Sequence, residues 1–200
     1  MKLYYARGAC SLSPRIVAEE AGIALDYEAV DLRTHKTASG ADYYAIAPKG
    51  YVPALVLDDG ALLSEGPAIV QYLAELKPEA GLLAPVGDIA RYRAIEWLAY
   101  VNSEVHKTFS PLFSPLTADA VKIEARASLE KKFAFVAGAL GDKPYLLGER
   151  FSVADAYFFV MTSWAIFQKI AVPEAIAQYR ARVTARPAVH RALKAEGLAQ

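Results

Sequence analysis

Hydrophobic positions along the chain first cluster in short runs and later recur with a helical period. The runs Lys2–Ala6 and Leu25–Leu32 predict two β-strands, because both are rich in strand-forming residues. Between them, Ser11–Pro14 predicts the start of a helix, since serine caps a helix and proline suits its first turn, and Gly22 is placed to end it. The order strand–helix–strand predicts a parallel pair joined by a right-handed crossover.

A hairpin and a second helix follow. Two apolar runs, Ala54–Leu57 and Ala61–Leu63, flank an Asp-Asp-Gly turn, and Asp-Gly favours a tight turn because it tolerates positive φ. A helix is predicted to start at Ser64. We therefore expect residues 1–78 to form a β-α-β unit followed by a β-β-α unit, and the stretch 79–87, with its proline and glycines, to form a linker.

From residue 88 onward the apolar positions recur every three or four residues, as they do in helices. Two such stripes are Ile95, Leu98, Val101 and Val105, and Leu129, Phe133, Val136 and Leu140. Ser152–Asp155 has the pattern of a capping box, and the helix that it opens is apolar nearly all round, which predicts a central position. The expected fold class is an α/β domain followed by an all-α domain at residues 88–200.

Composition narrows the function. Lys plus Arg and Asp plus Glu each number 22, so the net charge is zero, which argues against a protein that coats nucleic acid or an acidic membrane. The sequence has no signal-peptide pattern and no apolar run of membrane-spanning length, and we expect a cytoplasmic protein. A single cysteine excludes an intrachain disulfide, and the three histidines lack ligand spacing, so no metal site is expected.

Cys10 lies where the first predicted strand gives way to the first predicted helix. Backbone amides and the positive end of the helix dipole stabilise a thiolate at such a junction. The motif Cys10–Ser13 is C-x-x-S, in which the second thiol is replaced by a hydroxyl. A disulfide within the motif is excluded, but a mixed disulfide with an external thiol stays open. The alternative is a buried, unreactive cysteine.

The start of the second helix is a candidate for ligand binding. Amides at Ser64–Pro67 can hold a carboxylate, while Glu65 can hold an ammonium group, so a ligand that carries both groups on one carbon would suit the pair. The alternative is a plain helix cap. His35 follows the second strand, beside Lys36, and is expected to face solvent.

A polar helix face in the second domain carries His106. It shares that face with Ala99 and Ser103, because the three positions follow a helical spacing, and Lys107 lies beside it. An imidazole at a cleft can donate a hydrogen bond or transfer a proton. The alternative is a solvated surface pair of histidine and lysine.

Five short strings stand out when they are taken together. In chain order they are Gly8–Leu12, Ala47–Leu55, Leu63–Gly66, Glu104–Lys107 and Ser152–Ala156. In these strings and in its domain order, the chain resembles the beta-class bacterial glutathione transferases over essentially its whole length. The resemblance implies a thioredoxin-like amino-terminal domain that binds glutathione as a co-substrate, an all-helical second domain and a homodimer. It implies conjugation of glutathione to small hydrophobic electrophiles, or reduction of mixed disulfides through Cys10.

The resemblance also assigns residues to the site. Cys10 and His106 are the implied catalytic residues. Those implied to bind glutathione are Ser11, His35, Val52, Pro53, Glu65, Gly66, Ser103 and Lys107. The Val52–Pro53 bond is expected to be cis, with the Val52 backbone pairing with the cysteinyl part of glutathione. Glu65 and Gly66 are expected to hold the γ-glutamyl end.

Three positions depart from the family's pattern. His35 stands where lysine is more common, so its contact with the glycyl carboxylate becomes pH-dependent. Ala99 stands where relatives can carry an asparagine that contacts glutathione from the neighbouring subunit. Loss of that contact is expected to weaken glutathione binding by about 1 kcal/mol. Tyr51 replaces a residue that is often glutamine and changes the rim of the pocket.

Two other functions stay open at this point. A non-catalytic protein could store glutathione or hydrophobic ligands, and it would bind glutathione without turning over a chloronitroaromatic substrate. A specialised dehalogenase or ether-cleaving relative would keep the glutathione site and differ in its apolar pocket. We expect that pocket to be shaped by Thr108–Leu116 and Trp164.

Overall fold

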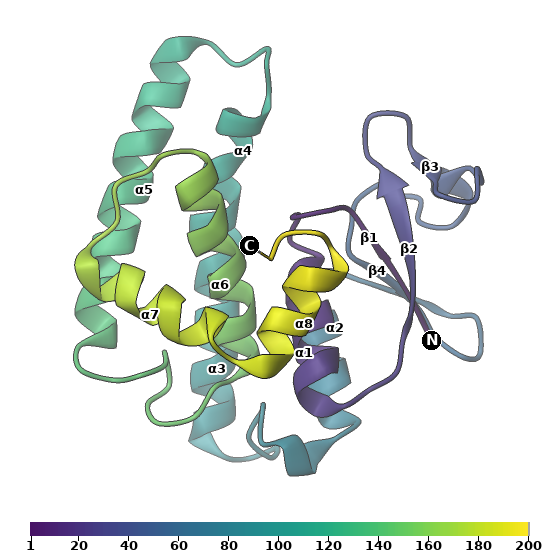
Figure 1. Cartoon of the computed structure of the whole chain (residues 1–200), viewed down its shortest axis with the longest axis horizontal. Helices are drawn as coiled ribbons and strands as arrows, with labels where there is room; N and C mark the ends of the chain where they lie inside the picture. The colour runs from purple at the N-terminus through teal and green to yellow at the C-terminus, as the bar shows by residue number, and fades with distance from the viewer. Residues whose placement is uncertain (200) are drawn as a thin grey trace. The chain divides into compact units, whose positions relative to one another are not determined.

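The computed structural model describes residues 1–199, which form two compact units (Figure 1). One unit comprises residues 1–83 together with residues 186–199, and the other comprises residues 84–185. The first unit contains a five-stranded sheet of order β3-β2-β1-β4-β5. Its strands are β1 (Lys2–Tyr5), β2 (Asp26–Asp31), β3 (Lys36–Thr37), β4 (Ala54–Val56) and β5 (Leu62–Ser64).

The sheet confirms the predicted order of elements. β1 and β2 are parallel, with Leu3 opposite Tyr27, and the helix α1 (Leu12–Ala21) connects them. β4 and β5 form the predicted antiparallel hairpin. α1 packs against α2 (Gly66–Glu75), and apolar side chains of these helices are fully buried with those of the sheet. The expected α/β class of the first domain is confirmed.

Two details of the first unit differ from the prediction. Ser11 does not cap α1, because its hydroxyl turns back to Ala6, accepting from the amide at 3.2 Å and donating to the carbonyl at 3.3 Å. The second helix does not start at Ser64, which ends β5. Glu65 is its N-cap residue, with φ of +71°, so one extra residue makes the turn from strand to helix.

The second unit is helical throughout its regular elements, which confirms the all-α prediction. These are α3 (Ile89–Tyr100), a π-helical segment (Val101–His106), α4 (Lys107–Phe113), α5 (Asp119–Leu140), α6 (Val153–Phe167) and α7 (Glu174–Thr184). The predicted central helix is α6, buried along Val153–Thr162 and opened by the predicted capping box of Ser152 and Asp155. The stripe along α5 is buried as expected.

The last helix, α8 (Pro187–Ala195), belongs to the first unit. It packs against α1, where Arg186 pairs with Glu20 at 2.6 Å and Arg191 with Glu19 at 2.8 Å. The expected all-α domain ran to residue 200, whereas the helical unit ends at residue 185. A helical period identifies a helix without identifying the domain on which that helix packs.

The described part of the chain, residues 1–199, has no helix that is both long and apolar enough to cross a membrane. Within those same residues, no three histidine, cysteine or acidic side chains come together in a way that would hold a metal ion.

Candidate functional site

Cys10 lies on the turn that leads from β1 into α1. Gly8 has φ of +69°, a conformation that favours glycine, and the amide of Ala9 donates to the carbonyl of Ala6 at 3.0 Å. The carbonyl of Cys10 accepts from the amide of Ser13 at 3.1 Å and from its hydroxyl at 2.8 Å. Cys10 is half-buried, two residues before the helix begins. The thiol is therefore held at a helix start, as the sequence predicted.

The loop before β4 supplies the partner of that thiol. The Val52–Pro53 peptide bond is cis, as the resemblance implied. The Cys10 thiol donates to the Val52 carbonyl, with Sγ 3.2 Å from the oxygen. Tyr43 also binds this loop, because its hydroxyl donates to the carbonyl of Tyr51 at 2.8 Å. Cys10, Val52 and Pro53 thus come together in one place.

Glu65 and Gly66 lie at the start of α2. The Glu65 side chain is exposed, and Oε1 accepts from Nζ of Lys49 at 2.7 Å, while the same ammonium donates to the Ser64 hydroxyl at 3.1 Å. Exposed pairs of this kind contribute little to stability. Their chemistry is a carboxylate and an ammonium side by side at a helix start, which can take a ligand with both charges. Lys49 is a residue that the sequence analysis did not single out.

His35 is partly buried and does not face solvent as expected. Its φ is +51°, and its ring lies over that of Tyr44 with centroids 4.4 Å apart. Gly50 permits this packing, since a Cβ there would lie 2.6 Å from Cε1 of Tyr44 and 3.2 Å from Cε1 of His35. Among the described residues, Nδ1 of His35 is buried without a hydrogen-bond partner.

A second group of the expected residues lies in the helical unit. Ser103 and His106 are on the π-helical segment, and Lys107 begins α4. π-Helical turns inside helices occur frequently at functional sites. Ser103 and Lys107 are exposed, and the Ser103 hydroxyl donates to the Ala99 carbonyl at 3.0 Å. His106 is the one residue of these three that is partly buried. The alternative of a solvated surface pair of histidine and lysine is therefore wrong for His106.

Tyr157 determines which ring nitrogen of the neutral His106 carries the proton. Nδ1 of His106 lies 2.6 Å from the Tyr157 hydroxyl, which donates its own proton to Oδ1 of Asn102 at 2.8 Å. The hydroxyl therefore accepts from Nδ1–H, which leaves Nε2 of the neutral ring as a proton acceptor. Burial, helped by the charge of Lys107, lowers the pKa of His106 to about 4. Tyr157 belongs to the helix that was predicted to be central, and the sequence pattern gave neither Tyr157 nor Asn102 a role in the site.

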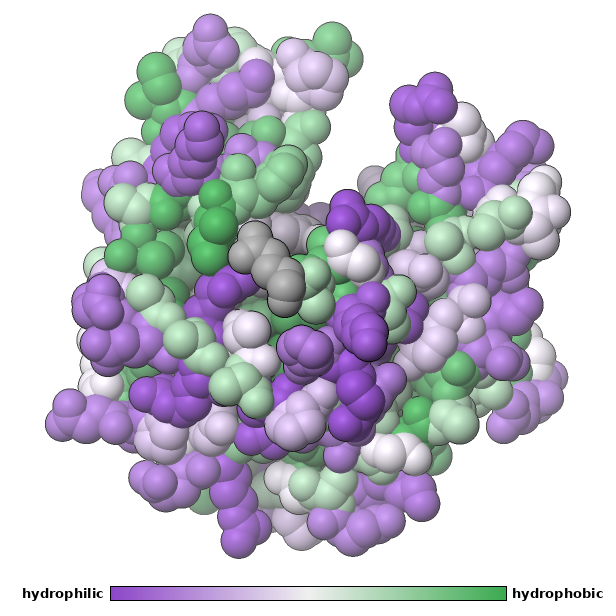
Figure 2. Space-filling model, viewed as in Figure 1, coloured by the Kyte–Doolittle hydropathy of each residue, from purple (hydrophilic) through white to green (hydrophobic). Residues whose placement is uncertain are grey.

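Aromatic rings surround His106 on the same unit. The Trp164 ring lies edge-on to His106 at 4.9 Å, to Phe109 at 5.5 Å and to Phe113 at 4.9 Å between centroids. Hydrophobic residues reach the surface near the connection from α4 to α5 (Figure 2), where Leu116 is 94% exposed. Of the side chains expected to form the apolar pocket, Trp164 therefore lies against the imidazole, and Phe109 and Phe113 lie against Trp164.

The lowered pKa of His106 gives a prediction for stability. The unfolded chain protonates this histidine near pH 6.5 and the folded chain only near pH 4, so the unfolded state binds the extra proton between these values. The contribution is present above about pH 6.5 and is lost as the pH falls toward about 4, by roughly 3 kcal/mol. Urea denaturation of the wild type and of His106→Asn, whose amide can still donate to Tyr157, measures it. We expect the wild type to lose more unfolding free energy than the variant, and equal losses would contradict the lowered pKa.

The comparisons with known proteins agree with this geometry. Residues 8–76 match the family model of the glutathione S-transferase N-terminal domain, and residues 100–187 match that of the C-terminal domain. Glutathione S-transferase GstA of Escherichia coli O157:H7 is 49% identical over 200 residues, covering 99% of this chain and 100% of that protein.

Solved structures are similar over the whole chain. A sphingomonad glutathione S-transferase complexed with glutathione is 41% identical with a TM-score of 0.94, covering 100% of both chains. A beta-class glutathione S-transferase of Sphingomonas chungbukensis is 42% identical with a TM-score of 0.94, covering 99% of this chain and 100% of that one. The present chain belongs to the glutathione S-transferase family, in its bacterial beta class.

Proposed function

We propose that this protein conjugates glutathione to small hydrophobic electrophiles and also exchanges mixed disulfides with glutathione through Cys10. The observation that carries the proposal is the Cys10 thiol, half-buried at the start of α1 and beside the Val52 carbonyl, in a domain of the glutathione S-transferase family. A detoxifying role, a homodimer and a cytoplasmic location are part of the same proposal and rest on the family likeness.

Each part of glutathione has a complementary group in the first unit. We assign the cysteinyl backbone to Val52, whose backbone precedes the cis proline. The γ-glutamyl end, with its ammonium and carboxylate, is assigned to Glu65 and the start of α2, with Lys49 as a further cation. His35 is assigned to the glycyl carboxylate, and Ser11 lies next to the thiol. The family resemblance also assigns Ser103, His106 and Lys107 of the helical domain to glutathione.

Conjugation needs the glutathione thiol to lose its proton. Nε2 of the neutral His106 ring can accept a hydrogen bond from that thiol, because Nδ1 is committed to Tyr157, but with a pKa of about 4 the ring is a weak base and the proton passes to water. The thiolate then forms a bond to the electrophilic carbon, and the leaving group departs with the bonding pair. The aromatic rings around Trp164 would hold a flat apolar electrophile.

Thiol exchange uses the protein's own sulfur. The Cys10 thiolate attacks the disulfide of a glutathionylated substrate, so that a Cys10–glutathione disulfide forms and the substrate thiolate leaves. A second glutathione then attacks this disulfide, which releases glutathione disulfide and restores Cys10. No second protein thiol is needed, in keeping with the single cysteine of the chain.

The test is the intact mass of the protein after incubation with glutathione disulfide, together with turnover of a chloronitroaromatic. We expect one glutathionyl adduct, removed by a reductant, and conjugation well above the uncatalysed rate. An adduct on this chain must lie on Cys10. Tight binding of glutathione with neither adduct nor turnover would instead support a storage protein and contradict the proposal.

A further inference from the structure

Glu196, close to the end of the chain, is a buried carboxylate. Its side chain is 0% exposed, although it follows the short surface helix α8. Burying a carboxylate is costly unless it is paired and hydrogen-bonded. Burial indeed raises the pKa of Glu196, against the opposing effects of its amide and arginine partners. The groups that it contacts therefore indicate what it does.

Both carboxylate oxygens bind the first unit near the start of the chain. Oε2 accepts from the amide of Gly8 at 2.8 Å, across 188 positions of sequence, and Oε1 accepts from Nε of Arg15 at 3.1 Å. Arg15 is itself 4% exposed, and its guanidinium carbon lies 3.6 Å from the Tyr27 ring centroid and 4.5 Å from that of Tyr5. The rings hold the arginine in place, so the carboxylate is fixed on one side by a rigid partner.

A second set of contacts holds the same loop from the backbone of the C-terminal segment. Arg7 donates from Nε to the Glu196 carbonyl at 2.8 Å and from Nη2 to the Gly197 carbonyl at 2.6 Å. Leu198 covers Gly8, since a Cβ at Gly8 would lie 3.8 Å from its Cδ2. Residues 7 and 8 are thus bound by both the side chain and the backbone of residues 196–198.

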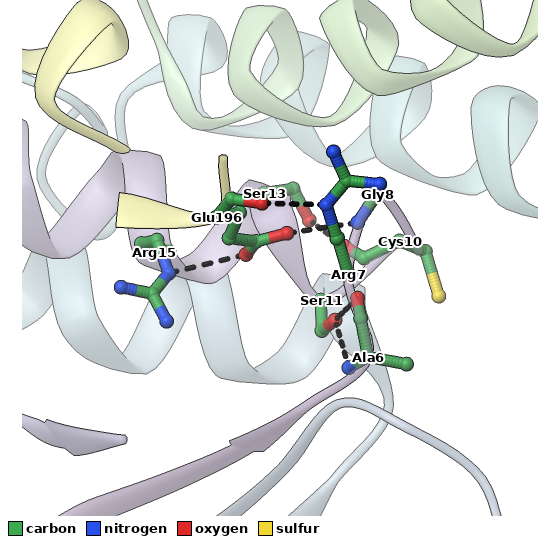
Figure 3. A network of polar contacts seen from close by, with 8 residues as sticks. All are labelled: Ala6, Arg7, Gly8, Cys10, Ser11, Ser13, Arg15 and Glu196. Carbon is green, nitrogen blue, oxygen red and sulfur yellow. Dashed lines mark hydrogen bonds and ion pairs between the residues drawn. The ribbon is translucent and has the colours of Figure 1, made fainter. Parts of the chain in front are cut away.

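Arg7 and Gly8 lie just before Cys10 in the sequence, on the turn that carries the reacting sulfur. Figure 3 shows Glu196 among Gly8, Arg7 and Arg15, while the Cys10 sulfur points away from it. We propose that Glu196 is a positioning residue: the segment 196–198 fixes the Arg7–Gly8 turn and thereby aligns the Cys10 thiol for exchange with a glutathione disulfide. The inference rests on the proposed thiol exchange through Cys10.

α8 is also joined to α1 by contacts that do not involve Glu196. Arg186 pairs with Glu20 and Arg191 with Glu19, both of them residues of α1. Glu196 binds the turn before Cys10 and adds a buried charge to it. If Glu196 only helped to hold α8 on α1, loss of the Arg191–Glu19 pair would have a similar effect on Cys10. If Glu196 positions the turn, loss of that pair would leave Cys10 unaffected. Arg191 therefore provides a matched control on the same segment.

Two variants separate alignment from charge. Glu196→Gln keeps the size of the side chain but places an NH2 group against one of two donors, the Gly8 amide or Arg15. Arg7→Lys keeps the positive charge and loses the two-carbonyl grip. Arg191→Ala breaks the pair with Glu19 and leaves the turn untouched.

For each protein, intact mass gives two rates at Cys10: formation of the glutathione adduct from glutathione disulfide, and alkylation by iodoacetamide. In the first reaction, the Cys10 thiolate attacks one sulfur of glutathione disulfide, so that a Cys10–glutathione disulfide forms and the other glutathione leaves as a thiolate. Both reactions need the thiolate, so their ratio cancels any change in its population, whereas only the larger disulfide needs an aligned sulfur. We expect this ratio to fall about tenfold in Glu196→Gln and Arg7→Lys and to stay within about twofold in Arg191→Ala.

Other results would overturn the inference. Wild-type ratios in Glu196→Gln and Arg7→Lys would show that the thiol needs no alignment from the C-terminal segment. An equal fall in Arg191→Ala would show a general effect of loosening α8. If the wild type reacts with iodoacetamide but forms no adduct with glutathione disulfide, the proposed thiol exchange itself fails, and the inference fails with it.

Discussion

Replacement of Cys10 by alanine is expected to abolish the reduction of mixed disulfides and to reduce conjugation only in part. Cys10 is the single cysteine of the chain, so no other side chain can form the protein–glutathione disulfide. We expect the exchange activity to fall by about a thousandfold or more, as for the loss of a covalent nucleophile. Conjugation uses the sulfur of glutathione itself, and we expect it to fall by about tenfold or less.

The two activities should be measured on the same samples, with hydroxyethyl disulfide and a chloronitroaromatic as substrates. Cys10→Ser is the matched control, because its hydroxyl can still donate to the Val52 carbonyl. It should lack exchange like the alanine variant and conjugate at close to the wild-type rate. An equal loss of both activities in the two variants would mean that Cys10 acts directly in conjugation, and would contradict the division of roles.

Local sequence signals were sufficient for most of the first unit. The apolar runs, the Asp-Gly turn and the glycine at position 22 each depend on neighbours within a few residues, and the structure has the strands, the hairpin and the end of α1 where these signals indicate. β3 was missed because two residues, Lys36 and Thr37, show no alternation. The short helical turn Tyr43–Ala45 was missed too, although Asp42 caps it in a recognisable way.

In the candidate site, too, local signals predicted some features, while features that depend on distant residues could not be predicted. Cys10 could be placed from its position between a strand and a helix. The tautomer of His106 could not, because it depends on Tyr157, which lies 51 positions along the chain and contacts it only through tertiary packing. The contact between Gly8 and Glu196 joins residues that are 188 positions apart in the sequence. One sequence, without the fold, holds no signal that pairs such residues.

Replacement of Asp155 by alanine is expected to have the largest effect on stability. The carboxylate is fully buried, and four donors converge on it: the amide of Leu146 at 2.9 Å, the amide and hydroxyl of Ser152 at 2.9 and 2.7 Å, and the Tyr179 hydroxyl at 3.1 Å. These contacts join the start of α6 to the loop before it and to α7. Alanine removes the acceptor of the Leu146 amide and of the Ser152 amide and hydroxyl, and it leaves the Tyr179 hydroxyl only the backbone carbonyl of residue 155 at 3.3 Å, at a cost of about 4 kcal/mol or more.

The measurement is the free energy of unfolding from urea titration, and the matched control is Ser152→Ala. That variant removes one hydroxyl and keeps the carboxylate with its three other donors, so we expect a loss of about 1 kcal/mol, typical of a helix N-cap. The large difference follows from the donors that stay buried: the serine variant keeps the carboxylate as acceptor, whereas the aspartate variant leaves the amides of Leu146 and Ser152 and the Ser152 hydroxyl without it. Similar losses in the two variants would show that the capping box, and not the convergence of donors on Asp155, stabilises this part of the helical unit.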